Sequence, residues 1–203
     1  MMWQDKIRGF YAVIDEVDPA LATQLLQVSK VLQVRVKGDA DKRAQVARWA
    51  REITRQHDAL LVVNDELELA LEVEADAVHL GQDDMSLSEA KGRAGGALLI
   101  GISTHNPEQV LAAVQGGADY LGYGPVFETT TKENPDPIQG PAALRRAVVL
   151  AGPTPVVAIG GVTPVRARLC FEAGAWAACA ISSVNRAEDA TKAATEIAAA
   201  FGC

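Results

Sequence analysis

The sequence predicts a (β/α)8 barrel, and three observations lead to this fold class. Short runs rich in Val, Ile and Leu recur along the chain, segments of helical periodicity lie between them, and eight such runs can be counted. Strands and helices that alternate at roughly 20 to 35 residues are typical of βαβ units in a parallel sheet. The predicted strands are FYAVID (10–15), VLQVRVK (31–37), ALLVVN (59–64), AVHLG (77–81), LLIGIST (98–104), YLGYGPV (120–126), PVVAIGG (155–161) and WAACAIS (176–182).

Helical periodicity is clearest over residues 41–56, 107–115 and 164–173. A doubly wound sheet is the competing architecture, but no G-x-G-x-x-G motif opens a helix after the first strand. The 203 residues suit a barrel of the smallest usual size, and nothing resembling a linker divides them. We therefore expect one barrel domain over residues 1–203.

Charge, hydrophobicity and cysteine content argue against nucleic acid and a membrane as partners and indicate the cellular compartment. The net charge of −7 includes no basic face of the kind that binds a phosphate backbone, so nucleic acid is not expected. No apolar run approaches the ~18 residues of a membrane span, and the first residues do not resemble a signal peptide. Cys170, Cys179 and Cys203 have neither metal-site spacing nor an even count. These features predict a reduced cytoplasmic protein, for which a homo-oligomer is possible.

In such a barrel the chemistry is expected where the strands end, so polar side chains at the strand ends are the candidate site residues. The second strand carries Gln33, Arg35 and Lys37 at a spacing of two, which places them on one face. Strands of a parallel barrel are usually almost wholly apolar. The three side chains are either solvated at an edge or form an anion clamp at the barrel mouth.

Acidic residues follow the next two strands. Asn64 and Asp65 end the third strand, and Gln82, Asp83 and Asp84 follow the fourth. One interpretation is that Asn64 and Asp65 cap the next helix. The other is that carboxylates on strands ~4.8 Å apart share one hard cation. Two carboxylates completed by water and phosphate oxygens are a usual Mg²⁺ site, which the basic trio next to them favours.

The fifth strand ends in Ser103 and His105, followed by Asn106, which we expect to cap the helix that begins at Pro107. His105 is either structural or catalytic, whereas His79, inside the fourth strand, is expected to be a satisfied core or loop-supporting histidine.

The last three strand ends predict a second anion site. Glycines after strand seven and Ser182–Ser183 after strand eight match a recurring barrel arrangement for phosphate. After strand six, Thr129, Thr131 and Lys132 offer hydroxyls and a charge to a phosphate or carboxylate. The segment that follows is either a lid over a reactive ligand or a disordered insertion.

Taken together, these segments resemble the thiamine phosphate synthase family over essentially the whole chain. The matching segments are LQVRVK, VVNDELELAL, ADAVHLGQDD, IGISTHN, GADYLGYGPVFETTTK, VVAIGGV and GA-x-A-x-x-AISS. The resemblance implies transfer of the hydroxymethylpyrimidine group from its diphosphate to thiazole phosphate, with release of pyrophosphate. It also implies the ligands: Gln33, Arg35, Lys37, Asn64 and Lys132 for the pyrimidine diphosphate, Ser103 for its ring, and Asp65 and Asp84 for Mg²⁺. Thr129, Thr130, Thr131, Gly161, Ile181 and Ser182 would hold the thiazole phosphate or its carboxylate.

The catalytic groups implied by the resemblance are Arg35, Lys37, Lys132 and Ser103. The chain departs from the family pattern at Glu66, where Arg is common, at Glu128, where Pro is common, and in YAVID, where Thr often precedes Asp. Two alternatives stay open. A thiazole tautomerase on the same barrel would need a base such as His105, and a non-catalytic barrel would only bind phosphate ligands.

Overall fold

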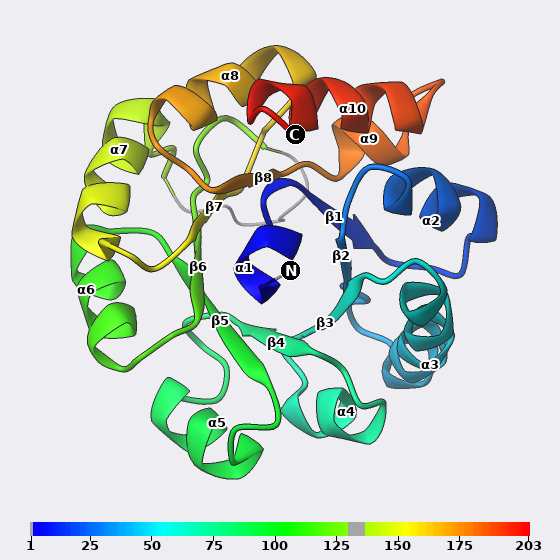
Figure 1. The fold of residues 1–203 in the computed structure, drawn as a ribbon. Helices are drawn as coiled ribbons and strands as arrows, with labels where there is room; N and C mark the ends of the chain where they lie inside the picture. The colour runs from blue at the N-terminus through cyan, green and yellow to red at the C-terminus, as the bar shows by residue number, and fades with distance from the viewer. Residues whose placement is uncertain (1, 130–136) are drawn as a thin grey trace.

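The strands of the computed structural model, which describes residues 2–129 and 137–203, close into a barrel (Figure 1). Each strand pairs in parallel with its sequence neighbour, and β8 pairs with β1, with Cys179 opposite Tyr11. The predicted (β/α)8 fold class is confirmed. The strands are β1 (Gly9–Ile14), β2 (Val31–Val34), β3 (Leu60–Asn64), β4 (Ala77–Leu80), β5 (Leu99–Thr104), β6 (Tyr120–Tyr123), β7 (Val156–Ala158) and β8 (Ala177–Cys179).

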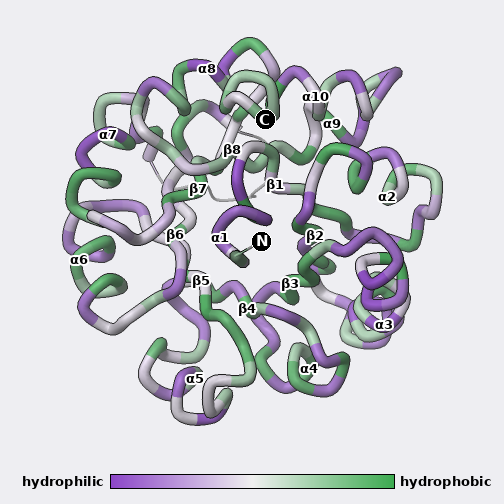
Figure 2. The backbone as a smooth tube through the Cα atoms, viewed as in Figure 1, coloured by the Kyte–Doolittle hydropathy of each residue, from purple (hydrophilic) through white to green (hydrophobic). Residues whose placement is uncertain are grey.

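Helices surround the barrel, and Figure 2 shows hydrophilic residues gathered on this outer ring. Helix caps follow sequence cues: the Asp39 carboxylate accepts a hydrogen bond from Lys42 N, and the Asn106 side chain accepts one from Gln109 N. The predicted cap at Asn106 is therefore confirmed. The helices are α1 (Trp3–Lys6), α2 (Pro19–Leu26), α3 (Ala40–Gln56), α4 (Leu67–Glu72), α5 (Leu87–Ala94), α6 (Pro107–Gln115), α7 (Gly140–Ala151), α8 (Pro164–Glu172), α9 (Ser182–Asn185) and α10 (Ala190–Ala200).

Helix α1 closes one end of the barrel, as seen at the centre of Figure 1. Trp3 and Ile7 pack against the apolar residues of the barrel interior. The indole N–H of Trp176, which precedes β8, donates a 2.7 Å hydrogen bond to the Gln4 carbonyl. Because the amino ends of the strands are covered in this way, a ligand site is expected at the carboxyl ends.

Several strands are shorter than the sequence predicts. The segment 31–37 is a strand only to Val34, so Arg35 and Lys37 lie beyond it and not on one strand face with Gln33. The neighbouring β1 ends at Ile14, and Arg35 N donates to the Ile14 carbonyl, which is the last point where β2 can pair with it. The predicted strands six, seven and eight end early as well, at Tyr123, Ala158 and Cys179. Among the described residues, no helix is both long and apolar enough to cross a membrane.

Candidate active site

A cavity of about 410 Å³ lies at the carboxyl ends of β1, β2 and β8. Four cationic side chains line it, from Arg35, Lys37, Lys42 and Arg186, against one acidic residue, Asp15. In a chain of net charge −7, this local excess of positive charge is suited to an anionic ligand. The other lining residues are Val13, Ile14, Val36, Ile181, Ser182 and Asn185.

The cavity brings together residues that lie far apart in the sequence. Arg35 and Lys37 follow β2, whereas Ile181 and Ser182 follow β8, and the two pairs meet because β1 joins their strands. Asn185 in α9 donates a 2.8 Å hydrogen bond from Nδ2 to the Val13 carbonyl, which holds this loop against β1. The two groups of predicted ligands therefore share one space.

Four polar lining residues were not predicted from the sequence: Asp15, Lys42, Asn185 and Arg186. Asp15 directly follows β1. Each of the other three lies in or directly after a helix that follows a strand end, within one turn of the helix start or end. Polar residues of the helical turn that follows a strand end are the signal for these three.

Asp65 and Asp84 are brought into contact at the neighbouring strand ends. The pKa of Asp65 is raised from 3.8 to about 7, first by burial and then by the hydrogen bond and charge of Asp84, whereas the charge of Arg35 opposes this shift. Neither acid caps a helix: α4 is preceded by Glu66 and α5 by Ser86, whose hydroxyl accepts from Glu89 N. The helix-cap interpretation of Asn64 and Asp65 is therefore wrong.

Asp65 and Asp84 are the carboxylates at this edge of the barrel that could hold a cation. The Asp84 carboxylate accepts a 2.6 Å hydrogen bond from Gly81 N, which fixes one of its oxygens. Two carboxylates in contact repel each other when both are ionised, and a divalent cation removes that cost. Within the described ranges there is no group of three or more His, Cys, Asp or Glu side chains arranged for a metal. The remaining ligand positions of a cation here would be left to water or a bound anion.

Inside the barrel, below the carboxyl ends of the strands, several buried polar side chains contact one another in a row. His79 in β4 contacts Ser103 through Nε2 at 2.9 Å and the Tyr120 hydroxyl through Nδ1 at 3.1 Å, so it is a satisfied histidine as predicted. Burial, and after it the charge of Arg35, lower the pKa of His79 to about 4 against a smaller opposing effect of Asp84, so the imidazole is neutral near pH 7. Asn64 is buried and lies opposite His79 in the β3–β4 register.

Gln33 occupies the far side of this row, where its amide nitrogen donates a 3.2 Å hydrogen bond to the Tyr11 hydroxyl. Gln33, predicted as a diphosphate ligand, is buried, and Ser103, predicted at the pyrimidine ring, is half-buried, so both lie inside the barrel and not at its rim. Tyr11 and Tyr120, which join them, were missed because they belong to apolar strand runs. The glycines of β5 and β6, which leave room for large interior side chains, were the available signal.

The loops after β6, β7 and β8 pack together on the other side of the mouth. Phe127 N donates to the Gly160 carbonyl at 3.0 Å, and Ser183 Oγ donates to the Val162 carbonyl at 2.8 Å. Gly161 has a positive φ of 64°, and a Cβ there would lie 2.2 Å from the Glu128 carbonyl oxygen. Glycine at this position is thus required by the neighbouring loop.

Other predicted site residues are placed as follows. Thr129 is half-buried and lies at the edge of the described segment, whereas Thr130, Thr131 and Lys132 lie outside the described residues. His105 follows β5, and its Nδ1 donates a 2.5 Å hydrogen bond to the Gly124 carbonyl. This histidine therefore supports the turn after β6.

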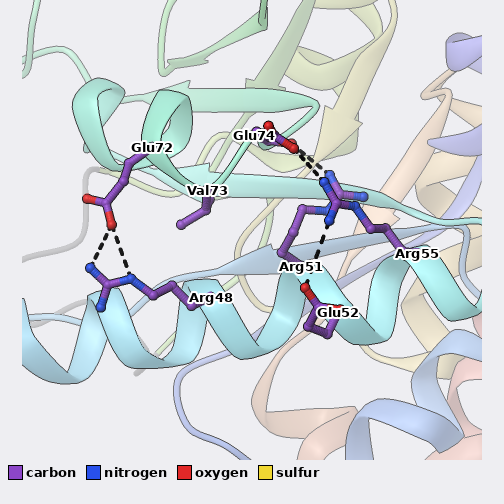
Figure 3. Close-up of a pocket in the computed structure, with 7 residues that line it drawn as sticks. All are labelled: Arg48, Arg51, Glu52, Arg55, Glu72, Val73 and Glu74. Atoms are coloured by element: carbon purple, nitrogen blue, oxygen red, sulfur yellow. Dashed lines mark hydrogen bonds and ion pairs between the residues drawn. The ribbon is translucent and has the colours of Figure 1, made fainter.

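A second hollow, of about 210 Å³, lies on the outer surface between α3 and α4 (Figure 3). Its three arginines are paired with acids: Arg48 with Glu72 at 2.6 Å, Arg55 with Glu74 at 2.6 Å, and Arg51 with Asp76 at 2.8 Å. These ion pairs neutralise the arginine charges and fasten α3 to the β3–β4 connection. The hollow is far from the strand ends and is not a candidate site.

Comparison with known proteins bears on the cavity at the strand ends. A family model described as thiamine monophosphate synthase matches residues 10–184. The chain belongs to this family. The chain is 41% identical over 175 residues to the thiamine-phosphate synthase of Geobacillus kaustophilus, covering 84% of this chain and 78% of the relative. It is 40% identical over 184 residues to that of Halalkalibacterium halodurans, covering 90% and 83%.

A solved structure agrees with the family assignment. The thiamine phosphate pyrophosphorylase from Pyrococcus furiosus superposes with a TM-score of 0.88 at 33% identity, and the match covers 99% of this chain and 98% of that one. The residues that the family model matches, 10–184, include the carboxyl end of every strand.

Proposed function

We propose that this protein transfers the hydroxymethylpyrimidine group from its diphosphate to thiazole phosphate and releases pyrophosphate. The observation that carries the proposal is the single cationic cavity shared by Arg35 and Lys37 with Ile181 and Ser182. A group transfer between two anionic substrates needs their two binding sites side by side. The relatives named as thiamine-phosphate synthases support a transferase of thiamine biosynthesis.

We further propose that Asp65 and Asp84 hold Mg²⁺. Their contact, and the resulting high pKa of Asp65, fit a pair that a cation would stabilise. When bound, the metal would supply positive charge to the departing diphosphate. Arg35 lies close enough to Asp65 to affect its pKa, so its guanidinium would reach the same phosphate oxygens.

The chemistry then depends mainly on charge. The bond between the pyrimidine methylene carbon and the diphosphate oxygen breaks, and its electron pair leaves with pyrophosphate. Arg35 and Lys37, with Lys132 outside the described residues, would stabilise that negative charge in a preorganised site. The aminopyrimidine carries the positive charge left on carbon, and the thiazole nitrogen donates its lone pair to form the new bond.

Binding and orientation complete the proposed roles. Gln33, Asn64 and Ser103 would hold the pyrimidine over the barrel floor, and Thr129, Thr130, Thr131, Gly161, Ile181 and Ser182 would hold the thiazole phosphate. A nitrogen fixed close to the reacting carbon gains from proximity and needs no general base. The absence of a required proton transfer fits a site whose interior histidine is neutral.

The thiazole tautomerase alternative is less well supported. Such an enzyme would depend on a base, and His105 uses Nδ1 to support the Gly124 carbonyl after β6. It would also have no use for the Asp65–Asp84 pair or for the cations of the cavity. A barrel that only binds phosphate ligands is distinguished by measuring turnover.

The test is an assay with both substrates and Mg²⁺, in which pyrophosphate and thiamine phosphate are measured together. We expect equal amounts of both products from the unmodified protein. Arg35→Ala should reduce both by a factor of a hundred or more, because losing one charge-stabilising donor costs about 3 kcal/mol of barrier. His105→Ala should keep substantial activity. Isomerisation of thiazole phosphate that depends on His105 and not on Arg35 would refute the proposal.

A further inference from the structure

A continuous hydrogen-bond chain crosses the barrel interior from β2 to β5. Gln33 Nε2 lies 3.2 Å from the Tyr11 hydroxyl, which lies 3.0 Å from the Tyr120 hydroxyl. The Tyr120 hydroxyl lies 3.1 Å from His79 Nδ1, and His79 Nε2 lies 2.9 Å from Ser103 Oγ. These hydrogen bonds thus connect Gln33 with Ser103, two of the three residues proposed above to hold the pyrimidine.

The barrel is built to accommodate this chain. Tyr11, Tyr120 and His79 are all buried, and the His79 and Tyr120 rings lie 5.4 Å apart. Gly101 in β5 leaves the room that they occupy, because a Cβ there would lie 2.2 Å from Tyr120 Cζ and 2.6 Å from His79 Nδ1. At Gly122 in β6, a Cβ would lie 3.2 Å from His79 Cε1. Glycine at these two positions therefore leaves the space that the Tyr120 and His79 rings fill.

One direction of these hydrogen bonds gives each buried hydroxyl proton an acceptor. An amide nitrogen can only donate, so the Tyr11 oxygen accepts from Gln33, and the buried Tyr11 hydroxyl then places its own proton on Tyr120. Tyr120 in turn donates to His79 Nδ1, which must then be the unprotonated ring nitrogen. In a neutral imidazole the proton is therefore on Nε2, which donates to Ser103 Oγ. With that acceptor position occupied by His79, the Ser103 proton is turned away from the chain and toward the site.

We propose that Tyr11, Tyr120 and His79 are positioning residues that make the Ser103 hydroxyl a hydrogen-bond donor to an unprotonated ring nitrogen of the substrate. The proposal rests on the proposed function. It goes beyond that function by naming the substrate feature that these hydrogen-bonded residues would select: a heteroaromatic ring that presents a nitrogen lone pair to Ser103. A ring that carries a hydrogen at that nitrogen would meet a second donor and would be rejected.

The first experiment measures the direction of these hydrogen bonds in the free protein, through the protonation of the two His79 ring nitrogens. Nitrogen NMR of the histidine rings, with the His79 signals identified by their loss in His79→Gln, should show protonated Nε2 and unprotonated Nδ1. Tyr120→Phe removes the donor to Nδ1, and a fraction of His79 should then move its proton to Nδ1. A wild-type His79 that is protonated on Nδ1, or on both nitrogens, near pH 7 would overturn the inference.

The second experiment is a double-mutant cycle with the pyrimidine diphosphate. Tyr120→Phe should raise its KM about tenfold, whereas the KM for thiazole phosphate should change less than twofold. The same substitution in a Ser103→Ala background should add almost nothing, because Tyr120 acts only through Ser103. Tyr123→Phe is the matched control, since its hydroxyl lies on the outer side of the same strand, near Gln139.

The outcomes separate this inference from the proposed function. Additive effects of Tyr120→Phe and Ser103→Ala, or equal changes in both KM values, would mean that Tyr120 has a purely structural role, and would overturn the inference alone. An unmodified protein that shows the expected His79 tautomer but makes no thiamine phosphate would overturn the proposed function, and the measured direction of the hydrogen bonds would stand.

Discussion

Arg35 acts on more of the site than any other described side chain for which a charge effect is resolved. Its positive charge opposes the upward pKa shift of Asp65 and contributes to the low pKa of His79. It also lines the cavity with Lys37. One guanidinium thus connects the acid pair, the buried row and the cationic cavity, which explains why its loss should affect turnover more than stability.

Asp65 provides a test of the metal proposal that does not depend on activity. Its pKa of about 7 exceeds the ordinary 3.8, so between these values the folded chain binds a proton that the unfolded chain has released. Stability should therefore fall as the pH rises from about 4 to about 7 in the absence of metal. Asp65→Asn should lose this part of the pH dependence, which thermal unfolding in EDTA would measure.

Mg²⁺ should reverse the loss in the unmodified protein, because a cation that binds only the folded state raises its melting temperature. At about pH 8 the ion should raise the melting temperature of the wild type and of Asp83→Asn, a control that changes an exposed acid next to Asp84. It should do so much less for Asp65→Asn or Asp84→Asn. Equal shifts in all four proteins would remove the two aspartates from the metal site.

At the scale of the elements, the sequence predicts the strands well and their ends less well. Apolar runs locate all eight strands, because burial on both faces of a parallel barrel requires them. The pattern of LQVRVK continues beyond Val34, but a strand lasts only while its neighbours can pair with it. That limit depends on tertiary structure, and no local pattern contains it.

In the candidate site, too, some residues can be predicted from the sequence and others only from the tertiary structure. Asp65, Asp84, Arg35 and Ser182 could be predicted because polar residues at strand ends of a barrel converge. Tyr11 and Tyr120 could not, since an aromatic residue within an apolar strand has the same pattern whether its hydroxyl is used or not. Only the contact between hydroxyls 3.0 Å apart distinguishes them from ordinary core residues.

Gly101 tests whether β5 is shaped for its neighbours. In Gly101→Ala the new methyl group would overlap the Tyr120 ring and His79, so the protein should lose about 1 to 3 kcal/mol of unfolding free energy. Because the same rings hold the hydrogen-bond chain, the KM for the pyrimidine diphosphate should rise as well. Urea denaturation and steady-state kinetics on one preparation would measure both effects.

Gly92→Ala is the control for this substitution. Gly92 lies in α5, is exposed, and has nothing within 4 Å of the added Cβ. Alanine is favoured over glycine in a helix by about 1 kcal/mol, so this variant should be equally or more stable and fully active. A Gly101→Ala protein that behaves like Gly92→Ala would show that the β5–β6 interior is less tightly packed than the structure indicates.

At the scale of the whole molecule, the two ends of the barrel have different roles. The carboxyl ends of the strands carry cations, acids and exposed loops, whereas the amino ends are closed by α1 and its apolar contacts. Such a division is common in barrels of this class: residues at the lower face affect stability and residues at the upper face affect chemistry. Substitutions at the two ends should therefore separate stability from activity.

Ile7 at the closed end provides that comparison. It is only 2% exposed and packs into the barrel interior, so Ile7→Ala should cost about 2 to 5 kcal/mol of unfolding free energy through lost burial and the cavity left behind. Its kcat and both KM values, measured well below the melting temperature, should stay within about twofold of wild type, because residues at the closed end of such a barrel affect stability and not chemistry. Arg35→Ala should show the reverse, with a nearly unchanged free energy of unfolding and little turnover.

An Ile7→Ala protein that remains folded but loses activity would contradict this division. It would mean that the closed end is coupled to the site through the barrel interior, where Tyr11 and Tyr120 belong to the same packed cluster as Ile7.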